Sequence, residues 1–290
     1  MIIGRLRQLT YRRGLVTFAD RLGLRKILAR IYCSCVAPRG VLRVQIGAHG
    51  YRFYARRPEE LRSLEGPIIT YSVNSAEKET LEQLTGLLKP GDVVYDVGAN
   101  VGLYSTVVGR LVGNQGRVVA FEPDARSYRR LQENLALNGL TNVLTFCKAL
   151  GEESSSARLY TFANDPWRSS LVKPQTDEML SEESVEVVAG DQFRRDKNLP
   201  VPVVAKIDVE GSEYAVIGGL RQTLADPACL LVCCEIHPRL LPGGLQPRDI
   251  IELLRSLGFV EIDVRPSGMV EYAVCRKRPS GGESGSKQLN

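Results

Sequence analysis

The chain has 290 residues, 43% hydrophobic and 24% charged, which is typical of a globular protein with one large domain and an extra segment. No apolar run approaches the roughly 18 residues of a membrane-spanning helix, and no secretory signal is expected. The chain has only two histidines, which argues against a His-rich metal site, and no C-x-x-C pair, which argues against a zinc ribbon. The seven cysteines are expected to be reduced. Residues 1–30 hold eight basic residues and one acid, a charge of +7 that leaves −2 for the rest, so specific nucleic-acid binding is not expected.

Residues 1–35 combine this basic charge with apolar residues at helical spacing, which predicts one or two amphipathic helices. Three interpretations are open: a helix that packs on the domain, a helix that lies on an anionic membrane surface, and an organellar presequence. The first is favoured because basic amphipathic stretches are weak evidence for membrane binding. Residues 41–55 then predict two short strands joined through Gly47–Gly50, so residues 1–75 form a helical and hairpin extension.

From residue 76 to residue 278 the pattern predicts one α/β domain. A helix over 77–88 is expected to end at Lys89-Pro90-Gly91. Strands are then predicted at 93–97, 117–122, 142–150, 201–208, 229–236, 259–264 and 270–275, with helices through 103–111, 128–135, 217–224 and 250–257. Apolar strands that alternate with amphipathic helices predict a doubly wound, mostly parallel sheet covered on both faces. The Gly- and Ser-rich tail, 279–290, is expected to be disordered.

About fifty residues of weak periodicity separate the strands predicted at 142–150 and 201–208. They include the single tryptophan, Trp167, and an acidic stretch over 177–186. A connection of this length is usually functional, so we expect it to form part of the substrate region.

The heptapeptide Asp96-Val-Gly-Ala-Asn-Val-Gly102 stands where the first predicted strand ends and a helix begins. In an open parallel sheet, ligands bind at the carboxyl ends of the strands near the switch point. Gly98 allows a tight turn, and Gly102 allows a ligand to approach closely. Glu122 ends the next strand, where a carboxylate can accept hydrogen bonds from a ribose diol. Together these residues predict a site for a nucleoside-containing cofactor.

A dinucleotide site would instead show the motif G-x-G-x-x-G. Counted from Gly98, its later glycines would stand at positions occupied by Asn100 and Leu103, so the motif fails. A pyrophosphate also binds best at a helix start without a competing anion, whereas Asp96 favours a cationic ligand such as S-adenosylmethionine. A turn that serves only strand–helix packing is the other alternative, and Glu122 makes it less favoured.

A second polar cluster, Lys206-Ile-Asp208-Val-Glu210-Gly-Ser-Glu213, follows the strand at 201–208. One carboxylate there could cap a helix, but three make a purely capping role less favoured. Because this strand should lie beside the first one, Asp208 is expected to face the same crevice as Asp96.

The strand at 229–236 ends in Glu235-Ile-His237, again at a carboxyl end. His237 is a general-base candidate with an expected pKa near neutrality. We predict that Asp208, Glu210 and His237 orient the acceptor and remove its proton. The sequence does not demand a metal, although Asp208 and Glu235 could bind a divalent ion.

Four blocks of the chain, in this order and spacing, resemble the FkbM family of methyltransferases: DVGANVGLYS, FEPDARSYRRLQENLALNG, KIDVEGSEYAVIGGL and CCEIHP. The resemblance covers about Glu77 to Val274. It implies a class I Rossmann-like methyltransferase fold with a seven-stranded sheet whose last strand is antiparallel. It also implies S-adenosylmethionine as cofactor and a hydroxyl of a sugar or polyketide-type product as acceptor. By this resemblance the cofactor residues are Asp96, Gly98, Asn100, Gly102 and Glu122, and the further family positions are Asp191, Asp208, Glu210, Glu213, Glu235 and His237.

The sequence therefore predicts an S-adenosylmethionine-dependent methyltransferase that acts on a hydroxyl of a sugar, glycan or secondary metabolite, in the cytoplasm or peripheral to a membrane. A NAD- or nucleotide-sugar-linked oxidoreductase is one alternative, disfavoured by the missing glycine motif. A non-catalytic binding module with the same fold is another, and the retained carboxylates of Asp96, Glu122 and Asp208 argue against it. Neither the acceptor nor the oligomeric state can be deduced.

Overall fold

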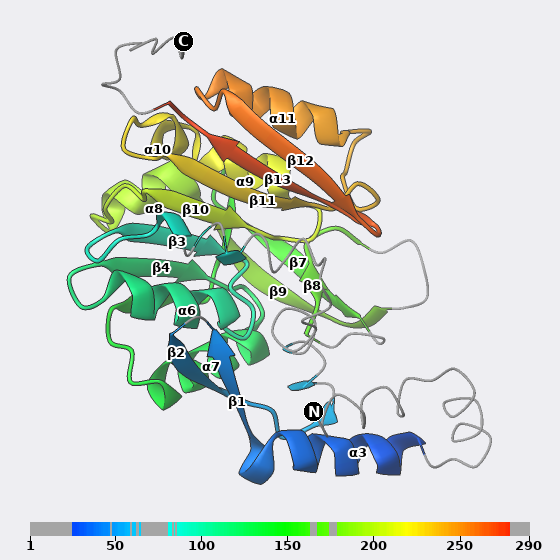
Figure 1. Ribbon diagram of the computed structural model, residues 1–290. Coiled ribbons are helices and arrows are strands. Elements are labelled where there is room, and N and C mark those ends of the chain that lie inside the picture. Colours follow the sequence, from blue (N-terminus) through cyan, green and yellow to red (C-terminus); the bar gives the residue numbers. More distant parts are fainter. Residues whose placement is uncertain are drawn as a thin grey trace, which may run out of the picture. The chain divides into compact units, whose positions relative to one another are not determined.

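The computed structural model describes residues 25–46, 48–58, 60, 61, 64, 81, 82, 84, 86–162, 167–173 and 179–278 (Figure 1). The chain divides into two compact units, Met1–Tyr71 and Ser72–Asn290. Most of the predicted N-terminal helical segment and the tail 279–290 lie outside the described residues. Within the described part of the chain, no helix combines the length and apolarity needed to cross a membrane.

The first unit contains a helix and a hairpin. Helix α3 (Arg25–Val36) leads through a short 3₁₀ turn, η1 (Pro38–Gly40), into strands β1 (Val41–Ile46) and β2 (His49–Tyr54). The strands pair antiparallel, as predicted. The turn is shorter than predicted, because Gly50 already lies in β2 opposite Gln45.

The second unit is built on a seven-stranded sheet with the order β12-β13-β11-β10-β3-β4-β5. Its strands are β3 (Val93–Val97), β4 (Arg117–Phe121), β5 (Val143–Phe146), β10 (Val204–Ile207), β11 (Leu231–Ile236), β12 (Glu261–Ser267) and β13 (Val270–Arg276). β13 runs antiparallel to both β11 and β12, and the other neighbouring pairs in this sheet are parallel. The predicted mostly parallel sheet is confirmed.

Helices cover both faces of this sheet. They are α6 (Leu103–Val112), α7 (Ala125–Leu137), α8 (Gly190–Asp196), α9 (Glu213–Gly219), α10 (Arg221–Ala225) and α11 (Pro247–Ser256). Successive strand residues face opposite sides, so Tyr95, Phe121 and Ile207 join the main core with α8 to α11. Ala120 packs on the other side against Leu131 of α7. Apolar strand runs without alternation follow from this two-sided burial.

The long connection contains strands that the sequence analysis did not predict. It forms an antiparallel sheet of β7 (Ser155–Phe162), β8 (Ser169–Ser170) and β9 (Met179–Ala189), to which β6 (Ala149–Gly151) adds in parallel. The prediction of one strand over 142–150 is wrong. Strand β5 ends where its partner β4 ends, at Phe121, and the chain then crosses to the second sheet, where β6 pairs with β9. The predicted helix over 217–224 is likewise divided, into α9 and α10 at Leu220.

Candidate active site

The loop after β3 is shaped by close backbone approach. Gly98 has φ +79°, and a Cβ there would lie 1.7 Å from the carbonyl oxygen of Asp208. The amides of Gly98 and Ala99 both donate to the carbonyl of Phe121 at 3.0 Å. Since β3 lies between β4 and β10, this loop joins the carboxyl ends of three strands. The predicted tight turn at Gly98 is confirmed.

Gly102 has a different role from the one expected. It precedes α6 with φ +85°, and a Cβ there would lie 2.4 Å from Leu131 Cδ1. The close neighbour that requires a glycine is therefore helix α7, which packs against the loop. Close approach of a ligand is not needed to explain this glycine.

Asn100 and Glu122 connect the loop to the end of β4. The amide of Asn100 donates to Glu122 Oε2 at 2.8 Å, and the amide of Asp124 donates to Glu122 Oε1 at 2.9 Å. Burial raises the pKa of Glu122 to about 8, against the opposing effect of these two amides. Asn100 also donates from Nδ2 to the carbonyl of Trp167 at 2.9 Å, which ties the long connection to the predicted cofactor loop.

Asp96 is buried beneath this loop. Its Oδ2 accepts a hydrogen bond from Ser105 Oγ at 2.6 Å, and its Oδ1 lies 3.6 Å from Lys206 Nζ. Oδ1 makes no hydrogen bond to the described residues. A buried carboxylate oxygen without a donor is costly, so this atom is suited to a cationic or hydrogen-bonding ligand.

Lys206 links the two predicted motifs. Its Nζ donates to the carbonyl of Gly98 at 3.0 Å and lies 3.3 Å from Asp208 Oδ2. Burial alone would lower the pKa of Lys206, but the carboxylates of Asp208, Asp96 and Glu235 outweigh it and raise the pKa. The lysine is therefore a permanent cation. Asp96 and Asp208 both lie near this lysine, at the ends of neighbouring strands.

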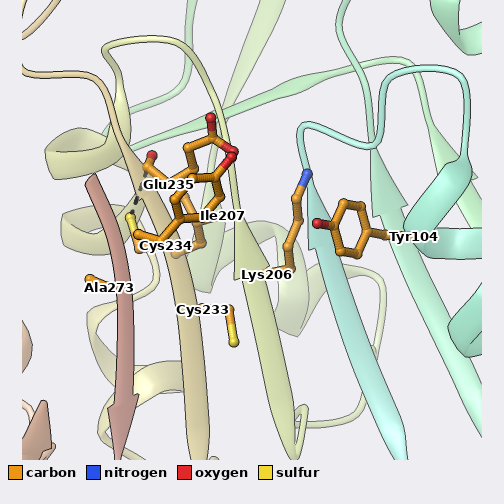
Figure 2. A pocket seen from close by; sticks show the side chains of 8 residues that line it. Tyr104, Lys206, Ile207, Cys233, Cys234, Glu235 and Ala273 are labelled. Carbon is orange, nitrogen blue, oxygen red and sulfur yellow. Dashed lines mark hydrogen bonds between the residues drawn. The ribbon is translucent and has the colours of Figure 1, made fainter. Parts of the chain in front are cut away.

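Lys206 also lies over the ring of Tyr104, 4.9 Å from its centroid, on the sheet face covered by α6. Figure 2 shows both side chains at a small pocket between the strands. Its lining residues are Tyr104, Lys206, Ile207, Cys233, Cys234, Glu235, Tyr272 and Ala273.

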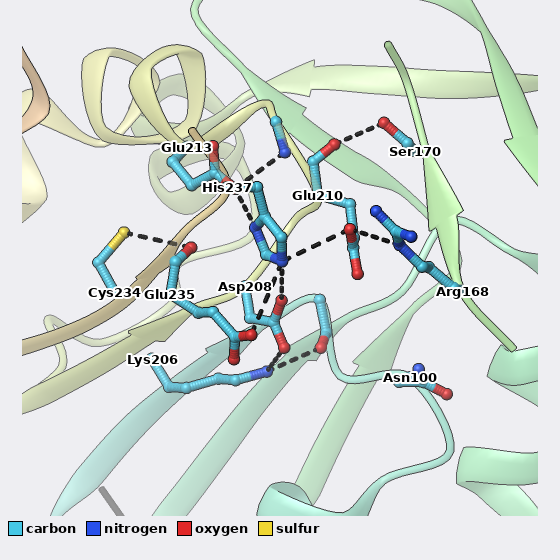
Figure 3. A network of polar contacts seen from close by, with 12 residues as sticks. Asn100, Arg168, Ser170, Lys206, Asp208, Glu210, Glu213, Cys234, Glu235 and His237 are labelled. Atoms are coloured by element: carbon cyan, nitrogen blue, oxygen red, sulfur yellow. Dashed lines mark hydrogen bonds and ion pairs between the residues drawn. The ribbon is translucent and has the colours of Figure 1, made fainter. Parts of the chain in front are cut away.

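His237 lies at the centre of a ring of carboxylates, as Figure 3 shows. Its Nδ1 is 2.8 Å from Oε1 of Glu213, which is fully buried at the start of α9 and also accepts from the amide of Gly211. Its Nε2 lies 3.4 Å from Glu210 Oε2, 3.7 Å from Glu235 Oε1 and 3.9 Å from Asp208 Oδ1. The predicted trio of Asp208, Glu210 and His237 is thus brought together.

The charge states in this ring differ from the expected ones. Burial by itself lowers the pKa of His237, but the hydrogen bond to Glu213 and the charges of Glu210 and Asp208 raise it to about 9. The expectation of a pKa near neutrality did not include these neighbours. Burial also raises the pKa of Glu210, while His237 and Arg168 oppose the shift.

Arg168 and Ser170 were missed by the sequence analysis. Arg168 Nε donates to Glu210 Oε2 at 2.7 Å, and Ser170 Oγ donates to the carbonyl of Glu210, which has φ +53°. The only available signal was the polar stretch around the single tryptophan in the long connection. Asp191 lies elsewhere: it accepts hydrogen bonds from the amides of Gln222 and Thr223 at 2.7 and 2.8 Å, and so caps α10.

The sheet is mostly parallel with one antiparallel strand, and a site rich in glycines and carboxylates lies at the carboxyl ends of its central strands. These features define the class I methyltransferase fold. The family model "Methyltransferase FkbM domain" matches residues 96–261, more than half of the chain. The chain belongs to this family of methyltransferases, and the resemblance noted in the sequence is confirmed.

The chain is similar to two methyltransferases from different organisms. The chain is 27% identical over 224 residues to the hexuronic acid methyltransferase AglP of Haloferax volcanii, covering 75% of this chain and 81% of the relative. It is 28% identical over 226 residues to the 31-O-demethyl-FK506 methyltransferase FkbM of Streptomyces tacrolimicus, covering 67% and 84%.

Two solved structures are similar to part of this chain. A methyltransferase FkbM from Methylobacillus flagellatus matches 66% of this chain at 18% identity with a TM-score of 0.46, and the match spans less than half, 45%, of that chain. Aeropyrum pernix fibrillarin, solved with bound S-adenosyl-L-methionine, matches 69% of this chain and 74% of its own at 15% identity with a TM-score of 0.40.

Proposed function

We propose that this protein is an S-adenosylmethionine-dependent O-methyltransferase whose acceptor is a hydroxyl of a sugar, glycan or secondary metabolite. The observation that carries the proposal is the contact between two loops. The predicted cofactor loop at Gly98 touches the backbone of Asp208, which begins the predicted acceptor loop. Donor and acceptor would therefore meet at adjoining strand ends.

The residues on the cofactor side fit S-adenosylmethionine. Asp96 Oδ1 lies 3.6 Å from Lys206 Nζ but accepts no hydrogen bond from the described residues, and it would accept one from the ammonium group. Glu122 uses each carboxylate oxygen for one amide, which leaves further lone pairs for two ribose hydroxyls. When bound, S-adenosylmethionine supplies a methyl group on a positively charged sulfur. Gly98, Asn100 and Gly102 would shape the loop that surrounds it.

The residues on the acceptor side would orient a hydroxyl and take its proton. The side chains of Asp208 and Glu210 are 29% and 19% exposed, whereas that of His237 is 7% exposed and lies behind them. The two carboxylates are therefore the groups that an acceptor reaches first. Holding the hydroxyl oxygen in line with the methyl carbon supplies the orientation effect, and a nearby carboxylate accepts the proton as the C–O bond forms.

The names of the two curated relatives support small-molecule or sugar acceptors, since one is a hexuronic acid methyltransferase and the other acts on 31-O-demethyl-FK506. The first name leaves two kinds of acceptor oxygen to test, a hydroxyl and a carboxylate. We propose the hydroxyl, because a carboxylate such as Glu210 at the predicted acceptor position can take a proton, and an ionised carboxylate acceptor has none to give.

The test is transfer of a labelled methyl group from S-adenosylmethionine to uronic acid glycosides, neutral sugars, macrolide alcohols and fractionated cell extract. We expect the label in an alkali-stable methyl ether. A product that loses its label in mild alkali is a methyl ester and would overturn O-methylation of a hydroxyl. Glu210→Gln should slow transfer by about 10²–10⁴-fold with cofactor affinity nearly unchanged, whereas the exposed Glu252→Gln serves as the matched control. Cofactor binding without any transfer would favour the non-catalytic alternative.

We also infer that α3 contacts an anionic membrane surface. Ile27, Leu28 and Ile31 share one exposed face of the helix, opposite the buried Cys33. Residues 1–30 carry a charge of +7, which complements anionic headgroups. The exposed apolar face and the positive charge together support this interpretation.

A further inference from the structure

The side chains of Asp208, Glu235 and His237 converge at the carboxyl ends of β10 and β11. One ligand atom from each lies within 4.8 Å of the other two. Nε2 of His237 is 3.9 Å from Asp208 Oδ1 and 3.7 Å from Glu235 Oε1. Two atoms that bind one ion at about 2.1 Å lie roughly 3.0–3.5 Å apart, so the two contacts of His237 would shorten by up to about 0.9 Å, and a pair 4.8 Å apart by more than about 1 Å, as the ion binds.

The orientation of His237 is a separate observation that points to a bound cation. The residue is only 6% exposed, and its ring is fixed by the bond from Nδ1 to the fully buried Glu213. A carboxylate on one ring nitrogen is the usual support of a metal-binding histidine, because it places the proton on that nitrogen and the lone pair on the other.

The other nitrogen, Nε2, is aimed at carboxylate oxygens of Asp208, Glu210 and Glu235, at 3.9, 3.4 and 3.7 Å (Figure 3). With no ion bound, a proton on Nε2 supplies the positive charge between the nitrogen and these three anionic oxygens. A proton on Nε2 can form a good hydrogen bond with one of these oxygens. A metal ion can bind the nitrogen and two of the oxygens together.

We propose that Asp208, Glu235 and His237 bind a divalent cation of the Mn²⁺ type, and that this cation takes the acceptor hydroxyl. Two carboxylates and one imidazole suit such an ion and leave coordination positions open. The ligands Asp208 and Glu235 are 29% and 20% exposed, so the ion and the acceptor can enter from solvent. The sequence analysis did not require a metal, but it left a divalent ion at Asp208 and Glu235 open.

This inference rests on the proposed function, and it adds a way in which the acceptor hydroxyl is activated. A divalent cation lowers the pKa of a hydroxyl that it binds, which favours loss of the proton to the neighbouring Glu210. The acceptor oxygen then forms the C–O bond with the methyl carbon. The bond between sulfur and methyl breaks, its electron pair stays on sulfur, and the neutral thioether leaves.

The experiment measures binding of Mn²⁺ to the full-length, EDTA-treated protein by electron paramagnetic resonance. We expect one site per chain in the wild type and in Glu261→Gln, a control on an exposed acid of β12. Glu235→Gln and His237→Gln should weaken binding by about 10–100-fold. Thermal melting checks that each variant is folded. If His237→Gln fails to fold, the partly exposed Glu235 carries the test alone.

The metal proposal would be overturned if the wild type had no Mn²⁺ site, or if wild type and Glu235→Gln bound Mn²⁺ with equal affinity. A proton on Nε2 would then be the bridging charge. Methyl transfer should fall at least tenfold in EDTA and return with Mn²⁺. Transfer that persists unchanged in EDTA would also overturn the metal but leave the proposed function standing. Absence of S-adenosylmethionine binding with and without Mn²⁺ would instead overturn the proposed function, while the resonance spectrum still decides the metal site.

Discussion

The Glu122 carboxylate should release a proton when it binds a ribose. Burial raises its pKa to about 8 in the ligand-free protein, so it is largely protonated at pH 6. Ribose hydroxyls that donate to the carboxylate favour its ionised form. Affinity for a ribose ligand should therefore rise as the pH rises from 6 to 8 and level off above 8. With about 1% of the group ionised at pH 6 and about half at pH 8, the gain is at most roughly 50-fold, about 2.3 kcal/mol.

The assay is titration calorimetry of 5′-methylthioadenosine between pH 6 and pH 8.5. This ligand keeps the adenine and ribose but lacks the titrating amine of S-adenosylmethionine. Glu122→Gln should bind about 10–100-fold more weakly at pH 8, because bonds to a charged acceptor are worth about 1.5–3 kcal/mol each, and its affinity should not vary with pH. Glu153→Gln, an exposed acid, is the control.

Glu122→Ala should also bind the cofactor more weakly, but it leaves the amides of Asn100 and Asp124 without their acceptor. Its effect therefore mixes a loosened loop with lost ribose bonds, and the glutamine variant is the cleaner test. A wild-type affinity that stays constant from pH 6 to pH 8 would refute the reasoning. So would a Glu122→Gln protein that binds as tightly as the wild type at pH 8.

Three further predictions concern other parts of the chain. Gly98→Ala should abolish cofactor binding and lower the melting temperature, because its Cβ would overlap a backbone carbonyl at 1.7 Å. Gly113→Ala has open space around it but a backbone at φ +64° and ψ −174° that favours glycine, and it should cost about 1–3 kcal/mol in chemical denaturation. Lys206→Met should cost about 3 kcal/mol of unfolding free energy, since it leaves buried carboxylates without their cation, and a loss below 1 kcal/mol would speak against that network. Ile31→Ser in α3 should reduce sedimentation of the full-length protein with anionic liposomes by several-fold; equal binding by the wild type to neutral liposomes would contradict the membrane assignment.

Much of the main sheet could be predicted because its signal is local. The runs at 93–97 and 231–236 are apolar except for Asp96 and Glu235, since each strand is buried on both faces, and each is followed by a glycine or polar residue. The position of Asp96 and Asp208 at neighbouring strand ends then followed from the strand order of a doubly wound sheet.

The rest depended on partners far away in sequence. Strand β5 ends where β4 no longer pairs with it, and nothing in residues 142–150 marks that point. Strand β7 buries Leu159 to Phe162 consecutively, so the alternation expected of an antiparallel strand is absent. The contact between Arg168 and Glu210, and the carboxylates that raise the pKa of His237, are likewise tertiary contacts that spacing does not reveal.

The central claim is that the carboxyl ends of β3 and β4 bind S-adenosylmethionine. The most direct measurement is calorimetry of the full-length protein with S-adenosylmethionine, its demethylated product and NAD under identical conditions. We predict dissociation constants on the order of micromolar for the first two and no measurable binding of NAD. Tight binding of NAD without any response to S-adenosylmethionine would contradict the account.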